Sequence, residues 1–245
     1  MKNRRLLLLL LPLATLAGYL LTGSFLLRSG TTLLCLFLIL YAYAREVSLC
    51  AGRSTTPSLR SSTLFVAAAL LLSFLGDYVL GHWGGSFLGF VCGVAVFLLA
   101  HLGYVAFCLC HGRVNWVWLA VLAAIFGAGY YGVLLRPRIG DAVTSSAVLA
   151  YVLVSCLSMA AALGLDKRGA RNGHPRNTGE PGTSALPFRA RFLFAAGIVC
   201  LLFSDLLIAQ RRFLGDGTLY ALMMPTYFAS QLLATASILT NTRPL

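Results

Sequence analysis

Charge is scarce in this sequence. Only 11% of its 245 residues are charged and 59% are hydrophobic, whereas a soluble globular domain carries about twice this charged fraction. Acidic residues are the scarcest, with seven Asp and Glu against 19 Lys and Arg. Because the hydrophobic residues also fall in long runs with few charges, the composition excludes an ordinary soluble domain and favours an integral membrane protein.

Motifs for metal binding and thiol chemistry are lacking as well. The seven cysteines include no CxxC pair, and most lie inside apolar runs, where cysteine usually behaves as a small hydrophobic residue. The four histidines are scattered along the chain and form no metal-binding set. The sequence therefore predicts no metal and no cofactor.

The net charge of +12 does not indicate a nucleic-acid-binding protein. The basic residues lie in short connections between apolar runs, where membrane topology explains them. We therefore expect no nucleic acid partner and take membrane lipids as the surroundings of the chain.

Eight hydrophobic segments are present, each close to the roughly 20 residues that span a bilayer. The first is too long for a signal-peptide core. We predict an all-α fold, a polytopic integral membrane bundle of about eight transmembrane helices forming one domain over residues 1–245. The predicted segments are 6–27, 31–50, 62–82, 85–110, 115–135, 142–165, 188–210 and 218–240.

The connections between these segments indicate the orientation. The stretch 166–187 is rich in Gly, Pro, Asn and Arg, which predicts a flexible loop. Counted on alternate sides, 14 Lys and Arg lie on the side of this loop and of both termini, and 5 lie on the other. The positive-inside rule then places both termini and the loop in the cytoplasm.

Two carboxylates, Asp77 and Asp205, lie inside apolar segments. A carboxylate within a span costs about 2.5–3.5 kcal/mol on insertion scales and usually faces the bundle interior or a water-filled cavity. A structural polar contact with Ser, Tyr or Gln on a neighbouring helix is the alternative explanation. We favour a functional role, because no Lys or Arg is predicted inside a span to compensate two such charges.

Asp77 and Asp205 are also expected at matching depth. Their predicted helices run in the same direction, and each residue lies about 22–24 Å from the cytoplasmic boundary at 1.5 Å per residue. We therefore predict a pair that shares one proton. The two helices are four spans apart, which fits a 4+4 internal repeat, although chance similarity between Leu-rich helices explains the short match equally well.

Other polar side chains inside the spans are candidates for substrate contacts. His101 and Tyr104 lie one turn apart, and Tyr227 and Gln231 lie at i and i+4 on one helix face; Tyr151 lies in the sixth segment. For each of them, an ordinary hydrogen bond between helices is the alternative.

These residues fall in motifs that resemble those of the YhhN family of membrane proteins, in the family's order over roughly residues 60–240. The motifs are FLGDYVL at 74–80, FLLAHLGY at 97–104, Y-x7-M at 151–159, LFSDLLIA at 202–209 and YFASQ at 227–231. Family members often carry a Lys-Pro pair before the third helix, and this chain has TTPSLR at 55–60 instead.

The resemblance implies an eight-helix lysoplasmalogenase, a hydrolase that cleaves the vinyl ether bond of a lysophospholipid substrate. It implies acid–base catalysis by Asp77 and Asp205. Arg211 and Arg212 are candidates for the lipid phosphate, with a plain topology signal as the alternative. The full set of predicted substrate-binding residues is His101, Tyr104, Tyr151, Tyr227, Gln231, Arg211 and Arg212.

Two other classes of protein fit the same residues. A proton-coupled transporter would use the two carboxylates as a proton relay. A lipid-binding protein would keep the fold without catalysis, although the two intact carboxylates argue against it. Lipid turnover in detergent, without a proton gradient, distinguishes the hydrolase from the transporter.

Overall fold

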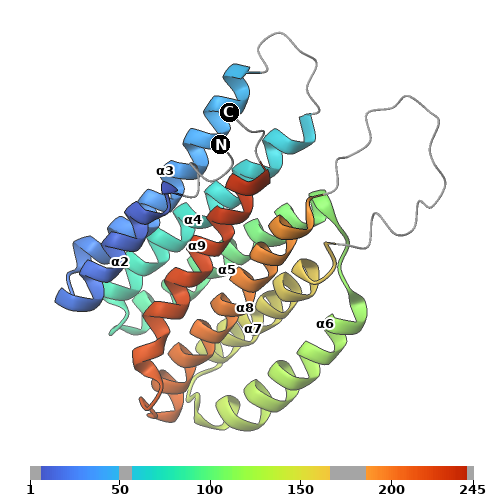
Figure 1. Cartoon of the computed structure of the whole chain (residues 1–245). Helices are drawn as coiled ribbons and strands as arrows, with labels where there is room; N and C mark the ends of the chain where they lie inside the picture. The colour runs from blue at the N-terminus through green and yellow to red at the C-terminus, as the bar shows by residue number, and fades with distance from the viewer. Residues whose placement is uncertain (1–6, 50–56, 166–185, 242–245) are drawn as a thin grey trace.

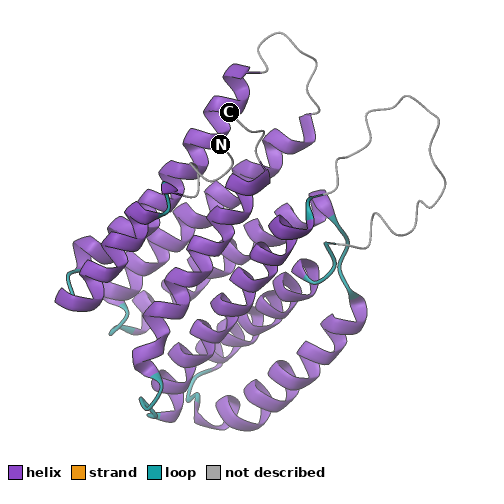
Figure 2. Cartoon of the chain, viewed as in Figure 1, coloured by secondary structure: helices purple, strands orange, loops and turns teal. Residues whose placement is uncertain are grey.

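The protein is helical throughout the part of the chain that the structure describes. This computed structural model describes residues 7–49, 57–165 and 186–241, and Figure 2 shows helices joined by short loops, with no strand in these ranges. The predicted all-α class is thereby confirmed.

The helices pack side by side as a bundle (Figure 1). In chain order they are α2 (Leu10–Thr22), α3 (Phe25–Leu49), α4 (Pro57–Trp83), α5 (Phe87–His111), α6 (Trp116–Leu122) continued by the π-helix η1 (Ala123–Leu135) and the 3₁₀ turn η2 (Arg136–Arg138), α7 (Ala142–Ala162), α8 (Phe188–Ala209) continued by the π-helix η3 (Gln210–Leu214), the 3₁₀ turn η4 (Tyr220–Leu222), and α9 (Met223–Asn241).

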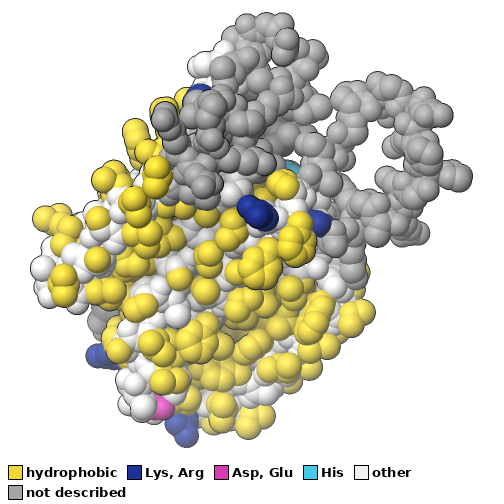
Figure 3. Space-filling view, in the orientation of Figure 1, with side chains coloured by type: hydrophobic (Ala, Val, Ile, Leu, Met, Phe, Trp, Pro, Cys, Tyr) yellow, Lys and Arg dark blue, Asp and Glu magenta, His cyan; other side chains and the backbone are white. Residues whose placement is uncertain are grey.

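Seven of these helical segments are long and apolar enough to cross a membrane. The eighth, α2, has 13 residues, which span about 20 Å, less than the roughly 30 Å hydrocarbon core. The visible face is largely hydrophobic, with basic side chains near its two ends (Figure 3). Large apolar side chains such as Phe37 and Leu88 are more than half exposed, as expected where lipid replaces water. The chain is a multi-pass membrane protein.

The boundary between the first two helices differs from the predicted one. We expected a break at residues 28–30, but α2 ends before Gly23, which has a left-handed φ of 67° and donates its N–H to the Tyr19 carbonyl at 2.7 Å. This is a common helix C-terminal cap. Because α3 already begins at Phe25, Arg28 lies inside a membrane-spanning helix. The prediction that no Lys or Arg lies in a span was therefore wrong.

Small residues bring the helices that carry the two carboxylates close to their neighbours. A Cβ atom at Gly76 in α4 would lie 2.7 Å from the Phe97 ring of α5, and a Cβ atom at Gly197 in α8 would lie 2.9 Å from the Ser230 carbonyl of α9. Close approach at small residues is a usual way to pack helices in membranes. The α4–α5 and α8–α9 pairs thus form the framework of the site.

Several predictions lie outside what the structure describes. Nearly all of the predicted 166–187 loop falls there, as do the side chains of the 55–60 segment that departs from the family pattern. The cytoplasmic location of the termini and the single-domain organisation also stay predictions.

Candidate functional site

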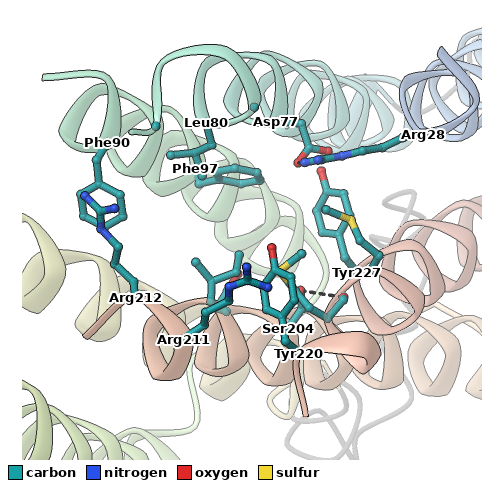
Figure 4. A pocket seen from close by; sticks show the side chains of 16 residues that line it. Arg28, Asp77, Leu80, Phe90, Phe97, Ser204, Arg211, Arg212, Tyr220 and Tyr227 are labelled. Carbon is teal, nitrogen blue, oxygen red and sulfur yellow. Dashed lines mark hydrogen bonds and ion pairs between the residues drawn. The ribbon is translucent and has the colours of Figure 1, made fainter. Parts of the chain in front are cut away.

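Asp77 and Asp205 line one cavity of about 300 Å³. Its walls come from α3, α4, α5, α8 and α9 with their adjoining short helices, and Figure 4 shows the side chains that point into it. The hydroxyl of Ser204, next to Asp205, donates to the Met223 carbonyl at 3.1 Å. That hydrogen bond fixes the start of α9 against α8 beside the cavity.

Asp77 is held by a cation. Its Oδ1 atom lies 2.6 Å from Nη2 of Arg28 in α3, and the two side chains are 10% and 18% exposed. The Tyr227 hydroxyl of α9 lies against the same carboxylate (Figure 4) and 3.3 Å from the Ser73 carbonyl. A guanidinium is permanently charged, so this arrangement compensates an ionised Asp77.

Asp205 has a different partner. Its Oδ2 atom lies 3.2 Å from Nε2 of His101 in α5, and the histidine is almost completely buried. The Tyr151 hydroxyl of α7 lies 3.1 Å from the same Nε2 atom. The other ring nitrogen, Nδ1, lies 3.0 Å from the Ser158 hydroxyl oxygen.

The hydrogen bonds of Ser158 indicate where the proton of His101 lies. The Ser158 hydroxyl donates to the Ser155 carbonyl at 2.9 Å, so its oxygen is left to accept from His101 Nδ1–H. A neutral histidine with its proton on Nδ1 has a bare Nε2, which needs a donor. The Tyr151 and Ser155 hydroxyls, 3.1 and 3.4 Å from Nε2, can supply that donor. A protonated Asp205 can supply it as well, and a cationic His101 would instead donate to an ionised Asp205. The geometry therefore allows a proton between Asp205 and His101 but does not require one.

No hydrogen bond joins the two carboxylates in the described part of the chain, so the predicted pair that shares one proton directly is not formed there. Within the described residues, each has its own partners, so a proton passing from one to the other has to cross the cavity.

Each carboxylate takes a partner from the half of the bundle that contains the other carboxylate. Tyr227, on the helix after that of Asp205, contacts Asp77, and His101, on the helix after that of Asp77, contacts Asp205. This pattern fits the 4+4 arrangement, which stays a prediction.

Two further arginines line the cavity at the end of α8. The Arg211 guanidinium lies 3.8 Å from the centre of the Tyr220 ring, and that of Arg212 lies 4.9 Å from the centre of the Phe90 ring. Neither forms an ion pair with a carboxylate that the structure describes. Both charges are therefore left uncompensated at the cavity wall.

The connection after these arginines is organised by Asp216. Its carboxylate accepts hydrogen bonds from the Thr218 hydroxyl, the Thr218 backbone N–H and the Gln210 side chain. The Thr218 hydroxyl and N–H are the main reason that the pKa of Asp216 is lowered. Asp216 thus stays ionised near neutral pH, but its hydrogen bonds are to the loop and not to the arginines.

The other predicted site residues divide into two groups. Tyr227 lines the cavity, and Tyr151 lines a second cavity that also reaches Asp205. Tyr104 and Gln231 line neither one. Tyr104 is buried edge-on against His101, and both side-chain polar atoms of Gln231 are buried without a partner among the described residues.

Arg28 was missed as a site residue, because we assigned it to a connection. The sequence Thr22-Gly23-Ser24 was the signal that could have found it, since a glycine between two hydroxyl residues is typical of a helix end. If the break is moved five residues earlier, Arg28 lies one turn inside a span. Its guanidinium can then pair with a buried carboxylate.

No group of three or more His, Cys, Asp or Glu side chains is placed to hold a metal ion in the described ranges. The absence of a metal from the working protein remains a prediction.

Comparison with known proteins agrees with the motifs. No curated protein and no solved structure matches the chain. The model of the YhhN family matches residues 25–238, a range that begins with α3 and contains both carboxylates with all of their partners. The chain belongs to the YhhN family.

Proposed function

We propose that this protein is a membrane hydrolase that cleaves the vinyl ether bond of lysoplasmalogen. The products are a fatty aldehyde and the glycerophospho-head group. The observation that carries the proposal is one cavity with two carboxylates in different settings, Asp77 beside Arg28 and Asp205 beside His101. Membership of a lysoplasmalogenase-like family that is associated with hydrolase activity supports it.

Asp205 is the acid in this proposal. Hydrolysis of a vinyl ether begins when a proton is added to the β-carbon, which leaves an oxocarbenium ion at the α-carbon and oxygen. In this proposal a proton lies between Asp205 and His101 at the edge of the cavity, and Asp205 delivers it to the β-carbon. General acid catalysis of this kind contributes typically 10²–10⁴-fold to the rate.

Asp77 is the carboxylate that meets the positive charge. Because Arg28 favours its ionised form, Asp77 presents negative charge to the same cavity that Asp205 lines. It stabilises the oxocarbenium ion and takes a proton from the attacking water. The resulting hemiacetal then breaks its carbon–oxygen bond to give the aldehyde. The glycerol oxygen leaves with the proton that Asp77 took from water, and the hemiacetal hydroxyl gives its proton back to Asp205.

The remaining predicted residues are given narrower roles. Arg211 and Arg212 bind the phosphate, and Tyr227 and Tyr151 orient the two carboxylate sites. We give no substrate contact to Tyr104 or Gln231, because neither lines either of these two cavities.

Asp77→Asn and Asp205→Asn test the proposal in purified, detergent-solubilised protein. Each variant should keep its fold and lose aldehyde release from a lysoplasmalogen, while Asp141→Asn, a carboxylate outside the cavity, should keep it. An ester lysophospholipid is the control substrate and should not be cleaved. Full activity of either cavity variant would overturn the assignment. Turnover in detergent also argues against the proton-coupled transporter, which needs a gradient.

A further inference from the structure

A second, smaller cavity of about 70 Å³ also borders Asp205. It is bounded mainly by α5, η1, α7 and α8, with Leu80 of α4 and Phe213 of η3, and its lining is almost wholly apolar. The two cavities share the wall residues Leu80, Phe90, Phe97, Asp205 and Ile208. They therefore meet at Asp205, between α5 and α8.

The two cavities have opposite character. In the larger one, Arg28 and Asp77 neutralise each other, whereas Arg211 and Arg212 have no described carboxylate partner. The larger cavity thus carries excess positive charge and suits an anion, since a guanidinium binds phosphate in a bidentate way. The smaller cavity offers only apolar contact, apart from Asp205 and the hydroxyl groups of Tyr130, Tyr151 and Ser155.

We propose that the smaller cavity is the binding site for one hydrocarbon chain, and that the two cavities together select an amphiphile with a phosphate and a single chain. The inference rests on the proposed function, because it assigns the two ends of the same substrate. The phosphate lies at Arg211 and Arg212, and the chain passes between Phe97 and Ile208 into the apolar cavity. The first carbons of the chain, which carry the vinyl ether, then lie beside Asp205.

This arrangement predicts two limits on the substrate, one on the number of its hydrocarbon chains and one on their length. A lipid with two chains is disfavoured, because the larger cavity at Asp205 holds the phosphate end in this proposal and is then not free for a second chain. The length of the chain is limited on the side of α7 and η1, where Val152 and Phe126 line the cavity. A larger side chain at residue 152 should therefore shorten the preferred chain.

Binding of saturated ether lysophospholipids tests the inference without turnover. These 1-O-alkyl lipids have the same head group and chain but no vinyl ether, and they can be compared at chain lengths of twelve to eighteen carbons by native mass spectrometry. Val152→Phe should weaken binding of the longest chain about tenfold relative to the shortest, as expected when about two methylene groups lose their contacts. Val152→Ala should leave the longest chain bound at least as well.

Matched control variants show whether a change in chain-length preference comes from the smaller cavity. Val199→Phe makes the same substitution at a position on α8 that is 45% exposed and lines neither cavity, so it should not alter chain preference. Arg212→Gln should weaken all chain lengths by the same factor. If Val152→Phe does not fold, Val94→Phe narrows the same cavity from α5 and should shift the preference in the same direction.

The outcomes separate this inference from the proposed function. Chain preference that is unchanged by the cavity variants, or changed equally by Val199→Phe, overturns the chain site even if aldehyde is released. Equal binding of a two-chain ether lipid also overturns it. A shift in chain preference without aldehyde release from the wild type keeps the chain site and overturns the hydrolase.

Discussion

Arg28 and Asp77 form an ion pair with 2.6 Å between Nη2 and Oδ1, although 49 residues separate them in the chain. A pair of buried opposite charges is weak evidence for stability as such, because removing both from water offsets much of their attraction. Their place on the wall of a cavity that also contains Asp205 is better explained by a role in holding Asp77 ionised and oriented.

Loss of Arg28 should therefore harm both stability and activity. Arg28→Met leaves the Asp77 carboxylate buried without its cation, and we expect the free energy of unfolding in mixed micelles to fall by roughly 3 kcal/mol. The double variant Arg28→Met/Asp77→Leu should recover most of that loss but release no aldehyde. If the double variant is no more stable than Arg28→Met, the ion pair does not explain the destabilisation.

His101 should be needed for chemistry more than for folding. His101→Asn removes the partner of Asp205, and we expect aldehyde release to fall about 10²–10⁴-fold. Ser158→Ala, which removes the acceptor of the Nδ1 proton, should have a smaller effect in the same direction. Rates from steady-state assays, with circular dichroism as the folding control, would check both. Equal losses for the two variants would contradict the proposed tautomer.

Gly76 should be intolerant of even one added methyl group. A Cβ atom there would lie 2.7 Å from the ring of Phe97, which lines both cavities. Gly76→Ala should push that ring toward the cavities and raise KM for a lysoplasmalogen, and overpacking of this kind typically costs about 1–3 kcal/mol of stability. Gly140→Ala is the control, because no atom lies within 4 Å of a Cβ at that position.

Asp141 gives a prediction outside the membrane. Its carboxylate accepts the backbone N–H of Thr144 at 2.7 Å as the N-cap of α7, and this hydrogen bond is the main reason that the pKa of Asp141 is lowered. A lowered pKa in the folded state contributes stability above the unfolded pKa of about 3.9, and that contribution disappears as the pH falls through the folded value.

Thermal unfolding as a function of pH checks this expectation. Asp141→Asn keeps a capping side chain but has no charge to titrate, so its transition temperature should depend less on acid pH than that of the wild type. Asp141→Ala should be the least stable of the three at neutral pH. A wild-type advantage over Asp141→Asn that grows with acidification would contradict the capping role.

The helical pattern was visible in the sequence because lipid imposes it. Every backbone polar group in a bilayer has to be satisfied within its own helix, so apolar runs such as 85–110 and 142–165 correspond closely to α5 and α7. The predicted helix boundary was wrong at Arg28, because a charged residue was assigned to a connection between helices. Only the left-handed turn at Gly23 shows that the chain had already reversed, which puts the arginine inside the bundle.

The sequence by itself determined the helical membrane class, the family motifs and the two carboxylates that stand out in apolar surroundings. The tertiary structure decided the partners of those carboxylates. Arg28 and Tyr227 contact Asp77, and His101 contacts Asp205. Each of these partners lies on a different helix from the carboxylate that it contacts. Helix periodicity specifies which face a side chain takes on its own helix, but contacts between helices depend on packing at distant small residues, which no local pattern records.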